Sequence, residues 1–324
     1  MTHAIRFHRT GGPEVLVWED IGIGKPGPGE ARIRHTAVGL NFVDIYYRSG
    51  LYAVPLPSGL GGEGAGVVVE VGPGVTDLRP GERVAYGAAP IGAYSEERLI
   101  PADRLLKLPE DIDDKTAAAM MLKGLTVQYL IRQTYRVKSG DTILLHAAAG
   151  GVGLILSQWA KHLGAIVIGT VGNEEKASLA KAHGCTHTII YSREDFVKRV
   201  EEITQGKKVP VVYDSVGKDT FLKSLDCLAP LGVAALFGQS SGSVEPLNLG
   251  LLAQKGSLFV TRPTLNTYAA KHESLVAMAK ELFDVVRSGA VKIEVRQTYP
   301  LKEAARAHAD LAARKTTGST VLLV

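Results

Sequence analysis

The sequence predicts an α/β protein in which a doubly wound parallel sheet is nested inside a β-rich domain. Three observations support this class. Residues 123–262 alternate strand-like apolar runs with helical stretches, and residues 1–122 read as short strands broken by Gly- and Pro-rich turns. A glycine-rich turn at 147–153 joins the first strand of the alternating part to a helix. The length of 324 residues suggests about two domains.

The first domain is expected to be discontinuous. Its early strands are predicted at 32–38, 65–71, 83–86 and 95–100. After Pro263 the chain returns to a helix, a strand, a helix and a last strand, predicted at 271–288, 292–299, 302–314 and 319–324. These late elements would complete the first domain, so we assign it residues 1–122 and 263–324, around a nested domain of residues 123–262.

The nested domain is expected to hold six parallel strands with helices on both faces of the sheet. Its strands are predicted at 142–146, 165–170, 188–191, 209–214, 233–237 and 258–261. Its helices are predicted at 123–135, 151–163, 173–183, 194–204, 219–228 and 249–254. Asn173 is a candidate N-cap, and Gly164 is a candidate C-cap.

Composition excludes several classes of protein. Hydrophobic residues make up 45% and charged residues 22%, which is typical of a globular chain. The net charge of +4 argues against a dedicated nucleic-acid binder. No apolar run approaches ~18 residues and no secretory h-region follows the N-terminus, so we expect a cytoplasmic protein without a membrane span. Two cysteines exclude a disulfide scaffold but leave one disulfide possible.

Glycine is over-represented, at 36 of 324 residues, or about 11% against a usual ~7%. The strongest chemical signal among them is the turn Ala147-Ala148-Ala149-Gly150-Gly151-Val152-Gly153. It fits A-x-G-x-x-G, a dinucleotide fingerprint in which Ala148 replaces the first glycine. Small residues let a pyrophosphate approach the helix N-terminus and let the helix pack on the strand. The alternative is a turn tightened only for packing, but its place at the first strand–helix junction favours a nucleotide site.

The tip of the second predicted strand favours NADP(H) over NAD(H). It reads Thr170-Val171-Gly172-Asn173 and lacks the acid that usually holds the ribose hydroxyls and repels a 2′-phosphate. Gly172 leaves room for a phosphate, Lys176 lies one turn into the next helix, and Tyr191 ends the third strand. Glu174 and Glu175 are either alternative ribose acids or first-turn acids facing the helix dipole.

Ordered blocks along the chain carry a family resemblance. Examples are Gly39-Leu40-Asn41-Phe42-Val43-Asp44-Ile45-Tyr46, Lys123-Gly124-Leu125-Thr126 and Val212-Tyr213-Asp214-Ser215-Val216-Gly217, with others at 11–15, 48–52, 146–153 and 256–263. Over essentially its whole length the chain resembles the medium-chain dehydrogenase/reductase superfamily. Within it, the chain is similar to the zinc-independent quinone oxidoreductases related to zeta-crystallin, and most to the bacterial NADPH:quinone reductases. The resemblance implies a GroES-like substrate domain, a Rossmann domain and an active site in the cleft between them.

The resemblance also implies site residues. Asn41 and Tyr46 are candidates for hydrogen-bonding an oxygen of the electron acceptor, and Tyr52 for stacking on a flat substrate. The alternative is that these residues only complete a buried turn and a domain edge. Arg262 and Arg314 have forked guanidinium groups that suit phosphates, although surface salt bridges are the alternative. The implied cofactor-binding residues are Phe42, Val43, Asp44, Ile45, Tyr46, Tyr129, Gly151, Val152, Gly172, Asn173, Lys176, Tyr191, Ser215, Phe237, Gly238, Gln239, Ser240, Thr261, Arg262, Pro263 and Arg314.

No catalytic zinc is expected. Zinc-dependent relatives carry an early Cys, a G-H-E motif and a later Cys. Here the motif reads Gly61-Gly62-Glu63, the early Cys position resembles Asn41, and no Cys precedes Cys185. Catalytic zinc needs three protein ligands, which Glu63 alone does not supply. Without a Lewis acid, an alcohol is a poor substrate, whereas a quinone or an α,β-unsaturated carbonyl is already activated as an acceptor of a hydride or of electrons. The sequence leaves both one-electron and two-electron transfer open.

The leading hypothesis is therefore an NADPH-dependent quinone reductase. An enone or 2-alkenal reductase with the same cofactor is the enzyme alternative. A non-catalytic role, structural or RNA-binding, is a third reading that zeta-crystallin relatives suggest. The family typically dimerises along the edge of the Rossmann sheet near residues 258–261, so we expect a homodimer.

Overall fold

The structure is a computed structural model that describes residues 2–88 and 90–324. Met1 and Ala89, which fall inside the first predicted domain, lie outside the described residues. The chain divides into two compact units. The first comprises Met1–Leu125, Tyr268–Arg287 and Ile293–Val324, and the second comprises Thr126–Thr267 and Ser288–Lys292.

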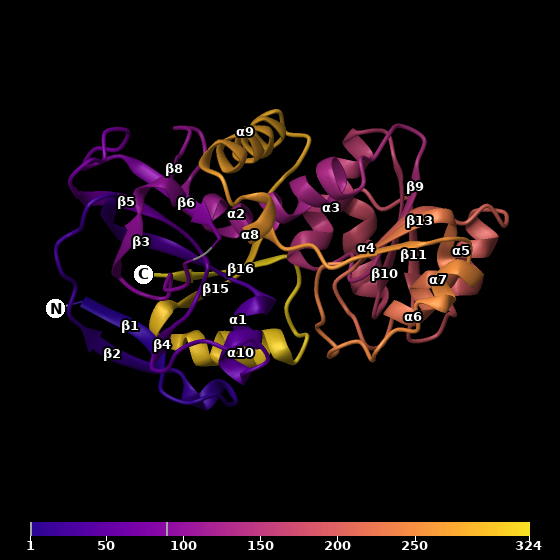
Figure 1. Ribbon diagram of the computed structural model, residues 1–324, viewed down its shortest axis with the longest axis horizontal. Helices are drawn as coiled ribbons and strands as arrows, with labels where there is room; N and C mark the ends of the chain where they lie inside the picture. Colours follow the sequence, from indigo (N-terminus) through magenta and orange to yellow (C-terminus); the bar gives the residue numbers. More distant parts are fainter. Residues whose placement is uncertain (1, 89) are drawn as a thin grey trace. The chain divides into compact units, whose positions relative to one another are not determined.

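The first unit is built on strands from both ends of the chain (Figure 1). Its seven-stranded sheet has the order β15-β16-β3-β5-β6-β8, with β7 also paired to β3, and a smaller sheet has the order β2-β1-β4. The strands are β1 (Thr2–Phe7), β2 (Val17–Ile21), β3 (Glu30–Leu40), β4 (Ser58–Gly59), β5 (Glu63–Val71), β6 (Arg83–Gly87), β7 (Glu97–Pro101), β8 (Leu106–Lys107), β15 (Val295–Pro300) and β16 (Ser319–Leu323). The late strand β16 pairs antiparallel with β3, so that the C-terminal segment completes the sheet begun near the N-terminus.

Four longer helices accompany these sheets: α1 (Phe42–Ser49), α2 (Asp114–Tyr129), α9 (His272–Arg287) and α10 (Ala304–Ala312). Helices α1 and α10 lie side by side although they are far apart in the sequence (Figure 1). A continuous core of buried side chains, among them Phe7, Ile33, Tyr86 and Tyr94, fills the interior between the sheet strands.

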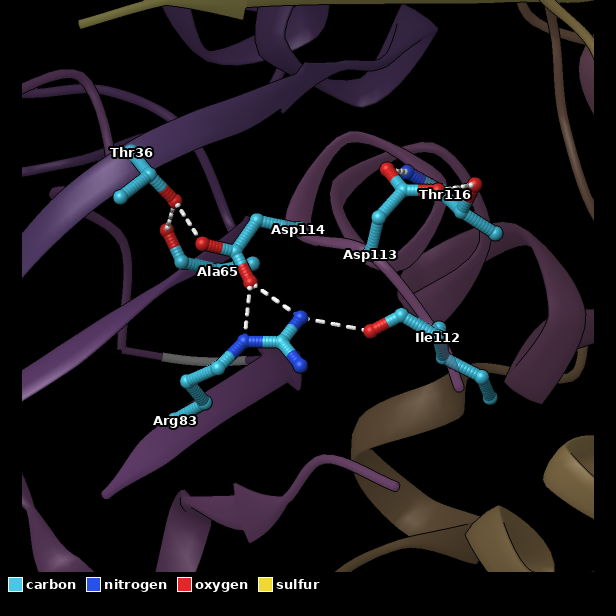
Figure 2. A network of polar contacts seen from close by, with 7 residues as sticks. All are labelled: Thr36, Ala65, Arg83, Ile112, Asp113, Asp114 and Thr116. Carbon is cyan, nitrogen blue, oxygen red and sulfur yellow. Dashed lines mark hydrogen bonds and ion pairs between the residues drawn. The ribbon is translucent and has the colours of Figure 1, made fainter. Parts of the chain in front are cut away.

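Helix α2 begins at a polar network (Figure 2). Asp113 accepts from the Thr116 backbone N–H at 2.9 Å and the Thr116 hydroxyl at 2.7 Å, which caps the helix. Asp114 accepts from Arg83 Nη2 at 2.6 Å and from the Thr36 hydroxyl at 2.6 Å, and so ties the helix start to β6 and β3.

The second unit has one six-stranded sheet of order β11-β10-β9-β12-β13-β14, all parallel. Its strands are β9 (Thr142–Leu145), β10 (Ile166–Val171), β11 (His187–Ile190), β12 (Val209–Asp214), β13 (Leu228–Leu236) and β14 (Phe259–Thr261). Its helices are α3 (Gly151–His162), α4 (Glu174–Ala182), α5 (Phe196–Ile203), α6 (Phe221–Ser224) and α7 (Gly250–Gln254), and the short α8 (Leu265–Tyr268) follows β14. This order, which runs outward from β9 in both directions, confirms the predicted doubly wound sheet.

Some predicted elements were wrong. Residues 1–122 are not only strands and turns, because α1 and the first half of α2 are helical. Residues 117–121 of α2 are alanines and methionines that are all fully buried, so this part of the helix is buried on every side and lacks the amphipathic period that reveals a helix. The predicted helix 219–228 is shorter, since α6 gives way to a 3₁₀ turn and β13 already begins at Leu228. Helix 302–314 is also shorter and is preceded by a 3₁₀ turn at Leu301–Glu303.

Other local predictions are confirmed. Asn173 caps α4 by accepting from the Lys176 backbone N–H at 2.9 Å. Gly164 follows α3 with φ +85°, in the left-handed region that ends many helices. Cys185 and Cys227 are buried free thiols, so the disulfide allowed by the cysteine count is not formed. Within the described part of the chain, no helix is long and apolar enough to cross a membrane.

Candidate functional site

The glycine-rich turn connects β9 to α3 in the second unit. Ala147 has φ +56°. The Gly150 N–H donates to the Ala147 carbonyl oxygen at 3.0 Å, and this hydrogen bond closes a tight turn. Gly150 is the N-cap of α3 and, being glycine, offers no side chain to the first-turn N–H groups. No side chain therefore caps those N–H groups, and uncapped N–H groups at the positive end of a helix dipole are a common place for an anion such as a pyrophosphate to bind.

Close packing explains which positions of the turn must be small. A Cβ on Gly153 would lie 2.5 Å from the Ala147 carbonyl oxygen and 2.6 Å from that of Ala148. Ala148 stands where the fingerprint usually has glycine. Its methyl group fits because Gly169 has no side chain: a Cβ on Gly169 would lie 2.6 Å from the Ala148 Cβ. The missing first glycine is thus compensated on the neighbouring strand, β10.

The tip of β10 gathers the residues predicted for the adenosine end. Gly172 follows the strand, and a Cβ there would lie 3.0 Å from the Tyr191 hydroxyl oxygen. Tyr191 is 47% exposed, so its ring is available to a ligand. Asn173 and Lys176 occupy the first turn of α4, next in the chain. The nearby acid Glu174 is paired with Arg193, so it does not stand there as an uncompensated charge.

The loops after β12, β13 and β14 meet at the same edge of the sheet. A Cβ on Gly238 would lie 2.7 Å from the Ser215 carbonyl oxygen, and the Ser240 N–H donates to that oxygen at 3.1 Å. Arg262 reaches across from β14 and donates from Nη1 to the Leu236 carbonyl at 3.0 Å. The structure therefore brings together most of the predicted residues that follow these strands: Ser215, Phe237, Gly238, Gln239, Ser240, Thr261, Arg262 and Pro263.

Two predicted residues belong to other elements of the chain. Tyr129 ends α2 and is 2% exposed, so its side chain belongs largely to the interior of the second unit. Arg314 belongs to the first unit, where it follows α10 with φ +58° and donates its backbone N–H to the Leu311 carbonyl at 3.0 Å.

In the first unit, Asn41 lies in a buried charged cluster that the sequence did not reveal. Asn41 Nδ2 donates to Glu63 Oε2 at 2.7 Å, and Lys123 Nζ donates to the same oxygen at 2.8 Å. The other carboxylate oxygen, Oε1, accepts from the Leu122 N–H at 2.9 Å. Glu63 is fully buried and the Lys123 side chain is 6% exposed. Gly39 has to be small, since a Cβ there would lie 2.1 Å from Glu63 Oε2.

This cluster does not fit a catalytic zinc ion. The neighbour of Asn41 and Glu63 is the Lys123 ammonium, which is itself a cation and has no lone pair to give. The carboxylate is already committed to that ammonium. Among residues 2–88 and 90–324, no group of three or more His, Cys, Asp and Glu side chains could hold a metal ion.

Asp44 is placed in the interior rather than at a surface. Its Oδ2 accepts from the Asn41 backbone N–H at 2.9 Å and from the Tyr94 hydroxyl at 3.0 Å. Its Oδ1 is buried and has no hydrogen-bond partner among the described residues. Burial raises the pKa of Asp44 to about 7, although the two hydrogen bonds oppose that shift. Beyond Tyr94 the network continues to His308 and Arg48, neither of which carried a recognisable sequence signal.

The aromatic residues of α1 and the following loop pack against one another. The Tyr46 and Tyr52 rings lie 5.2 Å apart at their centroids, edge to face, and the Phe42 and Tyr46 rings lie 5.7 Å apart. Tyr46 is 7% exposed, while Tyr52 is half-buried. Of the other predicted residues on α1, Ile45 is buried, whereas Phe42 and Val43 are partly exposed. The helix thus presents aromatic side chains close to Asn41.

Comparisons with known proteins agree with this architecture. The chain matches the family models for an alcohol dehydrogenase GroES-like domain over residues 27–110 and for a zinc-binding dehydrogenase over residues 151–280. It is 59% identical to a quinone oxidoreductase of Pseudomonas aeruginosa over the full length of both chains. It is 52% identical to a 2-haloacrylate reductase of a Burkholderia species, over all of this chain and 99% of that one. The solved structure of Escherichia coli quinone oxidoreductase complexed with NADPH matches with a TM-score of 0.98 and 51% identity, covering all of both chains.

Proposed function

Because this chain belongs to the quinone oxidoreductases of the medium-chain dehydrogenase/reductase superfamily, we propose that it transfers reducing equivalents from NADPH to a quinone. The observation that carries the proposal is the full-length similarity to the NADPH-complexed E. coli enzyme. The turn at 147–153 supports it independently, because the α3 N-terminus that follows it has no capping side chain and suits a pyrophosphate.

The second unit binds the dinucleotide in this proposal, and the first unit supplies the substrate-contacting residues. The α3 N-terminus with Gly151 and Val152 holds the pyrophosphate, while Gly172, Asn173, Lys176 and Tyr191 hold the adenosine end with its 2′-phosphate. When bound, NADPH supplies a hydride. Asn41 and Tyr46 contact the quinone oxygen, and Tyr52 stacks on the ring. The paired state of Glu174 supports NADPH, since an ionic partner offsets the charge that would repel a 2′-phosphate.

The enzyme works without zinc and in the cytoplasm in this proposal. The buried Glu63–Lys123 pair supports zinc independence, because it occupies the one carboxylate of the cluster with a cation of the chain itself. A homodimer along β14 is also part of the proposal. It is supported by the apolar surface around that strand, where Leu231, Leu249 and Phe259 are 65%, 72% and 58% exposed.

A panel of electron acceptors tests the function. Purified protein with NADPH should reduce 1,4-benzoquinone and 1,4-naphthoquinone, and elemental analysis of the active protein should find no stoichiometric zinc. Inertness toward quinones would refute the proposal. The 52% identical 2-haloacrylate reductase favours a second candidate, reduction of a C=C bond next to a carbonyl or carboxyl group. Rapid turnover of 2-chloroacrylate or a 2-alkenal without quinone reduction would establish that candidate instead.

A further inference from the structure

Lys123 is a buried cation with unused donors. Its ammonium carries three N–H groups, and within the described part of the chain one acceptor, Glu63 Oε2, lies on it at 2.8 Å. The side chain is 6% exposed, so bulk water does not readily satisfy the remaining donors. Burying donors without acceptors is costly, which makes this ammonium a place where an oxygen ligand is favoured.

The surroundings of Lys123 hold the ammonium in place. Glu63 is fixed by the Leu122 N–H at 2.9 Å and by Asn41 Nδ2 at 2.7 Å, so the carboxylate cannot turn away from the lysine. Gly39 and the Ala118 carbonyl close the other side, since a Cβ on Gly39 would lie 2.1 Å from Glu63 and 2.3 Å from that carbonyl. A charge held in a fixed position and shielded from water stabilises an opposite charge more strongly than a mobile one does.

Asn41 links this ammonium to the substrate. It shares Glu63 Oε2 with Lys123, and it is the residue that, in the proposed function, contacts an oxygen of the electron acceptor. The cation that lies within hydrogen-bond distance of this carboxylate is the Lys123 ammonium, which belongs to the protein itself.

We propose that Lys123 is a catalytic residue whose ammonium binds the quinone oxygen and stabilises the negative charge that oxygen gains on reduction. A quinone that accepts a hydride becomes a hydroquinone monoanion; NADPH gives the hydride and leaves as NADP⁺, and water supplies the proton that completes the hydroquinone. Lys123 keeps its protons throughout. Glu63 and Asn41 are positioning residues for the ammonium. This inference rests on the proposed function, because it names the group that acts on the quinone.

Kinetics of four variants separate this role from a structural one. Lys123→Met removes the positive charge but leaves the Glu63 carboxylate buried without its ionic partner. The double variant Glu63→Gln with Lys123→Met is the cleaner test, because it buries no unpaired ion. Both should lower kcat for 1,4-benzoquinone by about 10²- to 10³-fold, the usual effect of losing a group that stabilises an oxyanion. Glu63→Gln alone keeps the ammonium and should retain activity within about 10-fold. Lys280→Met, which removes an exposed ion pair with Asp284 on α9, is the matched control and should leave kcat unchanged.

A binding measurement avoids turnover altogether. 4-Nitrophenol absorbs at longer wavelength as the phenolate, so a titration on the NADP⁺-loaded protein reports the pKa of the bound phenol. Lys123 should lower that pKa by at least one unit in the wild type and not in the double variant. Glu63 from β5 and Asp44 from α1 face the same ammonium and oppose the shift, so Glu63→Gln should enlarge it.

The outcomes are distinct. If the wild type does not reduce quinones, the proposed function fails, and the phenolate titration still reads whether Lys123 stabilises an oxyanion. If the wild type reduces quinones while the double variant keeps both kcat and the phenolate shift, the role of Lys123 is overturned. Equal losses in Glu63→Gln and Lys123→Met, accompanied by equal loss of stability, would also overturn it, because a purely structural ion pair predicts that result.

Discussion

Arg48 Nη1 lies 3.2 Å from His308 Nδ1, and this contact fixes the protonation state of the histidine. A guanidinium can only donate, so Nδ1 must be an acceptor and the ring proton must lie on Nε2. Nε2 then donates to the Tyr94 oxygen at 3.1 Å, and the Tyr94 hydroxyl donates to Asp44 Oδ2 at 3.0 Å. Four buried side chains thus form one hydrogen-bond chain with a single direction, from Arg48 on α1 through His308 on α10 and Tyr94 back to Asp44 on α1.

His308 should make the first unit sensitive to acid. Burial, with help from Arg48, lowers its pKa to about 3, from 6.5 in an unfolded chain. Between about pH 6.5 and 3, His308 is therefore protonated in the unfolded chain but neutral in the folded chain. The free energy of unfolding falls as the pH drops through this range. Between pH 7.5 and 5.0 this loss should be about 2 kcal/mol, and His308→Gln should abolish it. Urea unfolding followed by Trp18 emission, in a Trp159→Phe background, isolates this unit; an unchanged pH dependence would contradict the assignment.

Asp44 should act in the opposite direction. Its folded pKa of about 7 lies above the unfolded value of 3.8, so the folded state binds the extra proton. Its contribution to stability is complete below about pH 4 and is lost as the pH rises through 7. Asp44→Asn should therefore remove a gain of about 2 kcal/mol that the wild type shows on acidification from pH 7.5 to 5.0. The same Trp18 measurement applies, and an Asp44→Asn variant with the same pH dependence as the wild type between pH 7.5 and 5.0 would show that the carboxyl is ionised in the fold.

Lys176 should determine the preference for NADPH. Lys176→Ala should weaken NADPH binding by about 10- to 100-fold, as expected for a lost charge-assisted hydrogen bond, and leave NADH binding nearly unchanged. Fluorescence titration with both dinucleotides measures the ratio. Lys181→Ala, an exposed lysine on the same helix α4, is the control and should change neither affinity. Tighter binding of NADH than NADPH by the wild type would reject the proposed cofactor.

Alanine substitutions at Gly153 and Gly150 should impair the protein in different ways. Gly153→Ala places a methyl group 2.5 Å from a backbone oxygen, so it should destabilise the second unit by about 1–3 kcal/mol. Gly150→Ala meets its nearest atom at 3.3 Å with an ordinary φ of −81°, so it should fold normally. It should nevertheless weaken dinucleotide binding, because its methyl group faces the incoming pyrophosphate. Trp159 emission during urea unfolding, together with NADPH titration, distinguishes the two; identical effects would argue against a phosphate site.

Phe259 should hold the proposed dimer together. Phe259→Asp adds a charge to an apolar edge strand and should convert a dimer into a monomer at micromolar concentration. Sedimentation velocity measures the mass directly. Val276→Asp, at a residue of α9 with 42% exposure, is the control and should leave the mass unchanged. A wild-type protein that sediments as a monomer would remove the homodimer from the proposal.

Local sequence patterns predicted the second unit well because its elements depend on near neighbours. The strand–helix alternation and the Asn173 cap are readable within a few residues of each other. The glycine-rich turn was equally visible, although its use of Ala148 made sense only once Gly169 was placed beside it.

The first unit was harder to predict for two physical reasons. Residues 117–121 of its second helix are apolar and fully buried, so periodicity could not separate this stretch from a buried strand. Its polar clusters join residues distant in the chain: Lys123 and Glu63 are 60 positions apart, and Arg48 and His308 are 260 apart. Such partners are brought together by the packing of whole helices and strands, and no local sequence motif indicates them.

Ala148 and Gly169 share, between them, the volume of a single methyl group. A Cβ on Gly169 would also lie 2.7 Å from Cys185 Sγ, so removing the Ala148 methyl group alone does not make room for alanine at position 169. A library that seeks a side chain at 169 should therefore vary Ala148 and Cys185 together with it. The three positions form one packing unit, although one follows β9, one lies within β10 and one follows α4.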